Sequence, residues 1–330
     1  MRTTLCRGQQ QLASNIVLID GFSGSGKALI GGFFGHLHRA EQWQVDDVYE
    51  YLAILNYIGE LSTESLSALL KTKSDKALYN LRIGRNVNFR PSDLSSPFND
   101  DLHEKYLKRL TSCEGQPVVD DIRASDPILP LNIHFIFGYS DALLTGFGDR
   151  LKLYILMLRH PLALIEAWHC GGWVRRVGSD SREFNLCIAH GKFRLPWYAR
   201  EYASLYLSAT DMERAILTVR ELYVRCFAMY RALDLDLKRK VLPICFEDFV
   251  SHPEAYVDNI CHRLNTVRAP SFGSRLSSLM GNRVREEPTD WFAFFSNKYR
   301  LELTSAYRGM ILDLIDSYEK FRNEVRMFTD

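Results

Sequence analysis

The stretch Asn15-Ile-Val-Leu-Ile-Asp-Gly-Phe-Ser-Gly-Ser-Gly-Lys-Ala28 decides the fold. Its apolar run, Ile16–Ile19, predicts a short β-strand that is buried on both faces. A glycine-rich loop follows, and the apolar residues from Ala28 onward predict a helix. A strand, a loop with the spacing G-x-x-x-x-G-K and a helix, in that order, are typical of a Walker A phosphate-binding loop.

This loop is expected to hold a phosphate group. Glycines let backbone N–H groups converge on an anion, the helix N-terminus adds partial positive charge, and the lysine adds a full charge. The residues predicted to bind the nucleotide here are Gly21, Ser23, Gly24, Ser25, Gly26, Lys27 and Ala28.

Position 28 departs from the pattern of nucleotide hydrolases, which have Ser or Thr there to help hold Mg²⁺. Ala28 has no side-chain oxygen. Either other groups hold a metal ion or the reaction needs none, and we expect no metal in the favoured interpretation.

The composition is that of a globular α/β protein. Lys and Arg total 41 against 40 Asp and Glu, so no overall field favours nucleic acid or a membrane surface. The seven cysteines are scattered without a C-x-x-C pair, which favours reduced thiols over a disulfide framework or a zinc site.

The sequence also predicts a cytoplasmic protein without a membrane span. No apolar run approaches the roughly 18 residues that a spanning helix needs. The segment Met1–Cys6 lacks the apolar core of a signal peptide.

Further strands are predicted after the first, with helices between them. They are Pro117–Asp121, Leu131–Phe137, Lys152–Leu158 and Val241–Phe246. This alternation predicts an α/β, three-layer P-loop fold with a parallel sheet flanked by helices. We expect one domain over residues 1–330, with helical insertions at about 46–112 and 170–235.

Several polar residues outside the loop are candidates for substrate binding. Asp46 and Asp47 either orient a substrate hydroxyl or cap the predicted helix Val48–Tyr57. Arg85 and Arg90 lie in a segment without helical or strand periodicity and suit an anionic group, or form a solvated basic loop.

Two strand ends carry further candidates. Asp120, followed by Asp121 at the end of a predicted strand, is a candidate metal ligand or base. Arg159 directly follows Lys152–Leu158, so its side chain is expected in the same crevice as the loop, or in a structural ion pair.

Later stretches resemble the sulfotransferases that use 3′-phosphoadenosine-5′-phosphosulfate (PAPS). Arg159-His160-Pro161 is similar to the family's R-x-P segment, and Phe246–Glu254 resembles its E-D-hydrophobic…P-E stretch. Arg283 and Arg285, ahead of Asp290-Trp291, resemble a basic donor-binding loop followed by D-W.

The resemblance implies a sulfotransferase that moves a sulfuryl group from PAPS to a hydroxyl of a small-molecule or carbohydrate acceptor, with no metal. It assigns the donor's 3′-phosphate to Arg159, with Arg283 or Arg285. It also assigns charge stabilisation to Lys27 and proton abstraction to His134, whose alternative role is that of a core histidine.

Two departures from the family are visible. In the family, the lysine stands two positions before the glycine. This chain has Gly24 at that position, and the lysine of this chain, Lys27, follows Gly26 as in kinases. The family serine after the arginine corresponds to Ala167.

Two alternatives follow from these departures. One is an ATP-dependent small-molecule kinase, with Asp46 or Asp47 as base and Asp120 or Asp121 on Mg²⁺. The other is a nucleotide-binding protein without turnover. The absence of side-chain hydroxyls at Ala28 and Ala167 fits such a protein.

Overall fold

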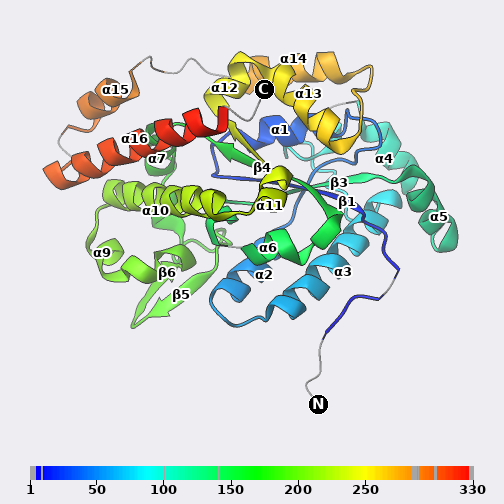
Figure 1. Ribbon diagram of the computed structural model, residues 1–330, viewed down its shortest axis with the longest axis horizontal. Helices are drawn as coiled ribbons and strands as arrows, with labels where there is room; N and C mark the ends of the chain where they lie inside the picture. The colour runs from blue at the N-terminus through cyan, green and yellow to red at the C-terminus, as the bar shows by residue number, and fades with distance from the viewer. Residues whose placement is uncertain are drawn as a thin grey trace.

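A parallel β-sheet forms the centre of the protein, seen in a computed structural model that describes residues 5–8, 10–99, 101–139, 141–283, 288, 290–300 and 303–326 (Figure 1). The strand order in the described residues is β2-β3-β1-β4-β7, and every neighbouring pair is parallel. The strands are β1 (Asn15–Gly21), β2 (Gln44–Val45), β3 (Ile128–Asn132), β4 (Leu151–Leu158) and β7 (Val241–Cys245). The predicted parallel sheet is confirmed.

The central strand β1 is buried on both faces, as its apolar run predicts. Ile16 and Leu18 belong to the larger apolar cluster on one face. Val17 and Ile19 belong to the smaller cluster on the other. Successive side chains of a strand alternate between faces, so each face of β1 packs against a different layer of helices.

Helices cover both faces of the sheet, which gives the predicted three layers (Figure 1). The smaller cluster is closed by α1 (Lys27–Phe34), α12 (Phe246–Ser251), α13 (Pro253–Leu264) and α14 (Phe272–Arg283). The larger one is closed by α2 (Val48–Tyr57), α3 (Thr63–Arg82), α6 (Asp141–Gly146), α7 (Pro161–Cys170), α10 (Asp211–Ala232) and α16 (Ser305–Arg326).

The remaining elements connect these layers. They are η1 (Pro97–Asn99), α4 (His103–Arg109), α5 (Gln116–Ser125), η2 (Phe137–Tyr139), η3 (Gly148–Arg150), α8 (Trp173–Arg176), β5 (Cys187–His190), β6 (Phe193–Pro196), η4 (Trp197–Tyr202), α9 (Ala203–Ser208), α11 (Leu235–Lys240) and α15 (Trp291–Lys298). Strands β5 and β6 form an antiparallel hairpin in the segment 170–235. No helix among the described residues has the length and apolarity to cross a membrane.

The prediction of a strand at Pro117–Asp121 is wrong. These residues lie in helix α5, whose first turn contains the proline. Proline is favoured at the start of a helix because the missing N–H has no partner there anyway. Asp120 and Asp121 are exposed on this helix, and Asp121 pairs with Arg82, so neither stands at the carboxyl end of a sheet strand.

The prediction of a strand at Leu131–Phe137 is right only for its beginning. Strand β3 ends at Asn132, and His134 lies in the turn that follows. Phe135 has a φ of 39°, in the left-handed region that non-glycine residues seldom adopt. The chain therefore turns directly after His134, at the carboxyl edge of the sheet.

Candidate active site

The loop between β1 and α1 has the compact shape of a phosphate cradle. The N–H of Ser25 donates to the carbonyl of Phe22 at 3.0 Å. Gly26 has a φ of 97°, and a Cβ there would lie 2.6 Å from the ring of Phe246. Only glycine fits, and no side chain caps the N-terminus of α1, which begins at Lys27. The local geometry thus has the features of an anion site at a helix N-terminus.

The Lys27 side chain is held inside the site rather than in solvent. It is 6% exposed, and its Nζ donates to the carbonyl of Ile133 at 2.7 Å. Burial lowers its pKa to about 8, although the charge of Asp20 acts in the opposite direction. The ammonium therefore sits where a bound anion would restore its usual preference for the charged form.

Arg159 lies against the same loop. Its Nη1 donates to the carbonyl of Gly24 at 2.7 Å. Its guanidinium carbon is 4.5 Å from the centre of the Phe246 ring. The backbone N–H of Arg159 donates to the hydroxyl of Tyr223 at 2.9 Å, which fixes the residue at the end of β4.

One cavity brings several of the predicted residues together. It has a volume of about 690 Å³, and its walls include Lys27, His134, Arg159, Phe246 and most of the loop, though neither Gly21 nor Ser25. These residues follow the carboxyl ends of β1, β3, β4 and β7, where open parallel sheets bind ligands. Lys27 and Arg159 therefore face one cavity.

Residue 167, where the family serine is missing, also lies beside the loop. The Cβ of Ala167 is 3.8 Å from the position that a Cβ on Gly24 would take. The next residue, Trp168, donates from its indole nitrogen to the carbonyl of Ser23 at 3.1 Å. Helix α7 thus supports the loop by a hydrogen bond from a side chain to the loop backbone.

His134 pairs with a glutamate that the sequence did not single out. Its Nδ1 is 2.7 Å from Oε1 of Glu50. Burial raises the pKa of Glu50 to about 8. Burial, followed by the charge of Lys27, lowers the pKa of His134 to about 3. The pair is therefore net neutral at pH 7 and becomes anionic when it loses one proton near pH 8.

Asp47 completes a cluster around His134. One ligand atom from each of Asp47, Glu50 and His134 lies within 4.8 Å of the others. Burial, and then the charge of Glu50, raises the pKa of Asp47. Two carboxyl groups therefore crowd one imidazole at this end of the cavity.

The sequence contained one signal for this cluster, the spacing of three residues between Asp47 and Glu50 at the start of the predicted helix. Helix α2 has the predicted bounds Val48–Tyr57, and residues three apart on a helix share a face. That spacing links Glu50 to Asp47, but nothing in the sequence joins either of them to His134. The pairing of Glu50 with His134 emerges only from the fold.

The structure does not bring the three predicted substrate-binding residues to this cavity. Asp46 pairs with Lys73 at 2.7 Å, and Arg85 pairs with Glu114 at 2.6 Å. Arg90 donates to the hydroxyl of Ser92 at 2.9 Å. None of the three lines the cavity around Lys27.

The predicted donor-binding arginines of the C-terminal part are not placed. Arg283 is the last residue of α14, and its side chain lies outside the described residues. Arg285 lies wholly outside them.

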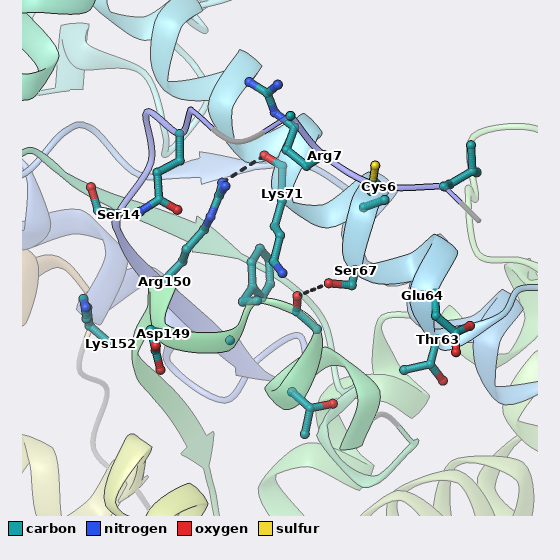
Figure 2. A pocket seen from close by; sticks show the side chains of 18 residues that line it. Cys6, Arg7, Ser14, Thr63, Glu64, Ser67, Lys71, Asp149, Arg150 and Lys152 are labelled. Atoms are coloured by element: carbon teal, nitrogen blue, oxygen red, sulfur yellow. Dashed lines mark hydrogen bonds between the residues drawn. The ribbon is translucent and has the colours of Figure 1, made fainter. Parts of the chain in front are cut away.

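A larger cavity, of about 890 Å³, lies elsewhere (Figure 2). It adjoins the residues ahead of β1 and the start of β4, at the amino ends of the strands. Figure 2 shows Arg150 donating to the carbonyl of Lys71, and Ser67 donating to Gly146. Because parallel sheets bind ligands at the opposite edge, the cavity around Lys27 is the candidate active site.

Comparisons with known proteins give similarity in structure alone. No model of a protein family matches the chain, and no curated protein sequence does. Similar solved structures include the sulfotransferase domain of the Synechococcus PCC 7002 olefin synthase, with a TM-score of 0.42, 14% identity and coverage of 96% of this chain and 98% of that one. A sulfotransferase domain from the curacin biosynthetic pathway has a TM-score of 0.45, 13% identity and coverage of 94% and 99%. The sulfotransferase STF9 from Mycobacterium avium has a TM-score of 0.43, 11% identity and coverage of 93% and 77%.

Proposed function

We propose that this protein is a sulfotransferase that moves a sulfuryl group from PAPS to a hydroxyl of a small-molecule or carbohydrate acceptor. The observation that carries the proposal is that Lys27, Arg159 and His134 line one cavity, next to the loop after β1. A phosphate-binding loop, a second cation and a base are the groups that such a transfer needs.

We expect the cavity of about 690 Å³ to take PAPS, an adenosine bisphosphate with a sulfuryl group on its 5′-phosphate. The loop and Lys27 would hold the 5′ end, and Arg159 with Arg283 or Arg285 would bind the 3′-phosphate. The Phe246 ring, which already contacts Arg159, offers an apolar surface between these two cation sites. When bound, PAPS supplies the group to be transferred.

The residues of this chain supply two further functions. Lys27 neutralises the negative charge that grows on the leaving phosphate oxygen, which is the kind of contact that is stronger in the transition state. His134 takes the proton from the acceptor hydroxyl. Once Glu50 has lost its proton, its carboxylate accepts a hydrogen bond from Nδ1–H, and this tautomer leaves Nε2 unprotonated as the base.

Ala28 supports sulfuryl transfer over phosphoryl transfer. The side chain has no oxygen for Mg²⁺, and a sulfuryl group carries less negative charge than a phosphoryl group, so the need for a divalent cation is smaller.

An ATP-dependent kinase is the second candidate. The observation that favours it is the position of Asp47 and Glu50, two carboxyl groups close to Lys27 that resemble a base and a metal ligand. It is weakened because Asp121, a predicted Mg²⁺ ligand on α5, pairs with Arg82 of α3 and lines neither this cavity nor its neighbour.

Ligand-induced stabilisation separates the two candidates. Adenosine 3′,5′-bisphosphate at about 100 times its Kd should stabilise the protein by about 2.7 kcal/mol without Mg²⁺. Lys27→Ala should abolish most of this effect, whereas Lys320→Ala, on the exposed face of α16, should preserve it. Stabilisation by ATP only with Mg²⁺ would support the kinase, and the absence of any effect of the bisphosphate would reject the sulfotransferase.

A further inference from the structure

A second cavity meets the first at His134. It has a volume of about 180 Å³ and shares Ser23 and His134 with the cavity of about 690 Å³. Its other walls come from α2 and its N-cap, from the turn after β3 and from the segment ahead of β5. The residues are Asp47, Glu50, Tyr51, Phe135, Arg182, Glu183, Phe184 and Asn185. If the larger cavity takes the donor, a hydroxyl compound in the smaller one also adjoins the imidazole of His134.

The smaller cavity is rich in carboxyl groups. Asp47, Glu50 and Glu183 all line it. Among the described residues, neither Asp47 nor Glu183 forms an ion pair, and Glu183 accepts a hydrogen bond only from the amide of Asn185 at 2.6 Å. Glu50 is 7% exposed, and its second oxygen, Oε2, accepts no hydrogen bond from the described residues. This cavity therefore presents uncompensated acceptor oxygens.

The arginine of this cavity does not offset these charges. Both sides of the Arg182 guanidinium bind Asp180, with Nε 3.1 Å from Oδ1 and Nη2 2.8 Å from Oδ2. Such a bidentate pair uses the geometry that would otherwise bind an anionic substrate. Lys27 donates to the carbonyl of Ile133 and lines the larger cavity, and its charge acts to lower the pKa of both Asp47 and Glu50 without overcoming the effect of burial.

Aromatic rings supply the rest of the lining. Tyr51, Phe135 and Phe184 contribute rings to the smaller cavity. The hydroxyl of Tyr51 donates to the carbonyl of Phe184 at 2.8 Å, which ties the segment ahead of β5 to helix α2. Carboxylates together with aromatic faces form the surface that organic ammonium groups prefer.

Arg85, which the sequence offered for an anionic group, and Arg175 in α8 are engaged elsewhere. Arg85 pairs with Glu114, and Arg175 pairs with Asp211 at 3.3 Å. Neither lines the cavities that meet at His134. The carboxylates of Asp47 and Glu183 thus supply the negative charge that attracts a cation, whereas Glu50, which is mostly protonated at pH 7, adds an acceptor oxygen rather than charge.

We propose that the acceptor is a cationic alcohol, such as an amino alcohol or an amino sugar. Its ammonium group would lie among Asp47, Glu183 and the rings of the smaller cavity, with its hydroxyl at His134. In the transfer, the acceptor oxygen forms its bond to sulfur while the bond from sulfur to the leaving phosphate oxygen breaks, and the hydroxyl proton passes to His134. This inference rests on the proposed sulfotransferase function.

Two alcohols of nearly equal shape test the charge alone. Choline carries a quaternary ammonium, and 3,3-dimethyl-1-butanol is its neutral isostere. We expect choline to bind at least about tenfold more tightly when both are measured by ligand-observed NMR with saturating adenosine 3′,5′-bisphosphate. Equal binding of the two alcohols, preference for the neutral one, or no binding of either overturns the proposal.

Variants identify the residues responsible for the preference. Asp47→Asn and Glu183→Gln should each reduce the ratio of the two affinities to about threefold or less. Glu183 lies in an exposed segment, so its variant tests the proposal even if the Asp47 variant unfolds. Glu104→Gln, whose carboxylate pairs with Lys108 on α4, should keep the wild-type ratio. An unchanged ratio in both cavity variants contradicts the proposal.

Two outcomes separate this inference from the function on which it rests. Binding of the bisphosphate without choline preference overturns the cationic acceptor and leaves the sulfotransferase standing. No binding of the bisphosphate overturns both. Stabilisation by Mn²⁺ that Asp47→Asn abolishes, with no choline binding, also overturns the proposal and identifies the cluster of Asp47, Glu50 and His134 as a metal site.

Discussion

Two buried glutamates, Glu41 just before β2 in the sequence and Glu50 just after it, have opposite electrostatic surroundings. Glu41 is 1% exposed and receives hydrogen bonds from Arg82, Arg109 and the hydroxyl of Tyr106. Burial acts to raise its pKa, but Lys105 and the two arginines lower it to about 2. Glu50 is similarly buried, yet burial prevails and raises its pKa to about 8.

The difference lies in how completely each carboxylate is compensated. Glu41 joins the segment before β2 to α3 and α4 through ion pairs, and its charge is part of the fold. Glu50 has one hydrogen bond, to His134, and its charge is costly in the resting protein. Perturbed and poorly compensated groups in a cavity are typical of functional sites, whereas fully paired ones are structural.

The largest contrast is expected in stability. Glu41→Gln leaves Arg82, Arg109 and Lys105 without their carboxylate and should lower the free energy of unfolding by about 3–5 kcal/mol at pH 7. Glu50→Gln replaces a carboxyl group that is mostly protonated at pH 7 and should change the same quantity by less than about 1 kcal/mol. Urea unfolding of both variants measures the difference, and equal losses would contradict the comparison.

The effect of pH on that loss has a defined sign. Because the pKa of Glu41 is depressed from 4.5 to about 2 on folding, its stabilisation is present above pH 4.5 and disappears as the pH falls toward 2. The difference in the free energy of unfolding between wild type and Glu41→Gln should therefore shrink as the pH falls from 4.5 toward 2.

A smaller effect is expected on catalysis, and it should concern Glu50 alone. Glu50→Gln removes the group that orients His134 and should lower kcat for sulfuryl transfer by about 10²-fold. Steady-state kinetics with saturating PAPS measure this loss. Because the two residues act as a unit, adding Glu50→Gln to His134→Ala should cost little more than His134→Ala alone. Fully additive losses would show that Glu50 does not act through His134.

The parts of the fold and of the candidate site that could be predicted from the sequence are those with a local signal. The β1 strand, the loop and the helix Val48–Tyr57 were predictable because their signals are local: an apolar run, a glycine spacing and helical periodicity. The strand Lys152–Leu158 was predictable for the same reason, and Arg159 follows from its end. These elements set the fold and one half of the candidate site.

The other half depends on contacts between distant parts of the chain. Glu50 and His134 are separated by 84 positions, so no local pattern joins them. Pro117–Asp121 forms a helix because its apolar residues cover one side only, while Asp121 pairs with Arg82. The ion pairs of Arg85 and Arg175 likewise involve partners that the sequence does not identify.

The smallest expected effect is on the pH dependence of kcat/KM, which reports the groups of the free enzyme. Activity should rise toward pH 8, because the Glu50–His134 pair must lose a proton to act as a base. It should fall above pH 8, because Lys27, with a pKa of about 8, loses its charge. The result is a narrow maximum near pH 8, with changes of a few-fold per pH unit on each side.

Two variants separate the limbs of this profile. Glu50→Gln should remove the rising limb, since its amide does not titrate. Lys27→Arg should remove the falling limb, since a guanidinium stays charged throughout this range. Glu41→Gln, whose carboxyl group is ionised over the whole interval, should alter neither limb in the fraction that remains folded. A rising limb that persists in Glu50→Gln would assign the proton to another group and would break the distinction between the two glutamates.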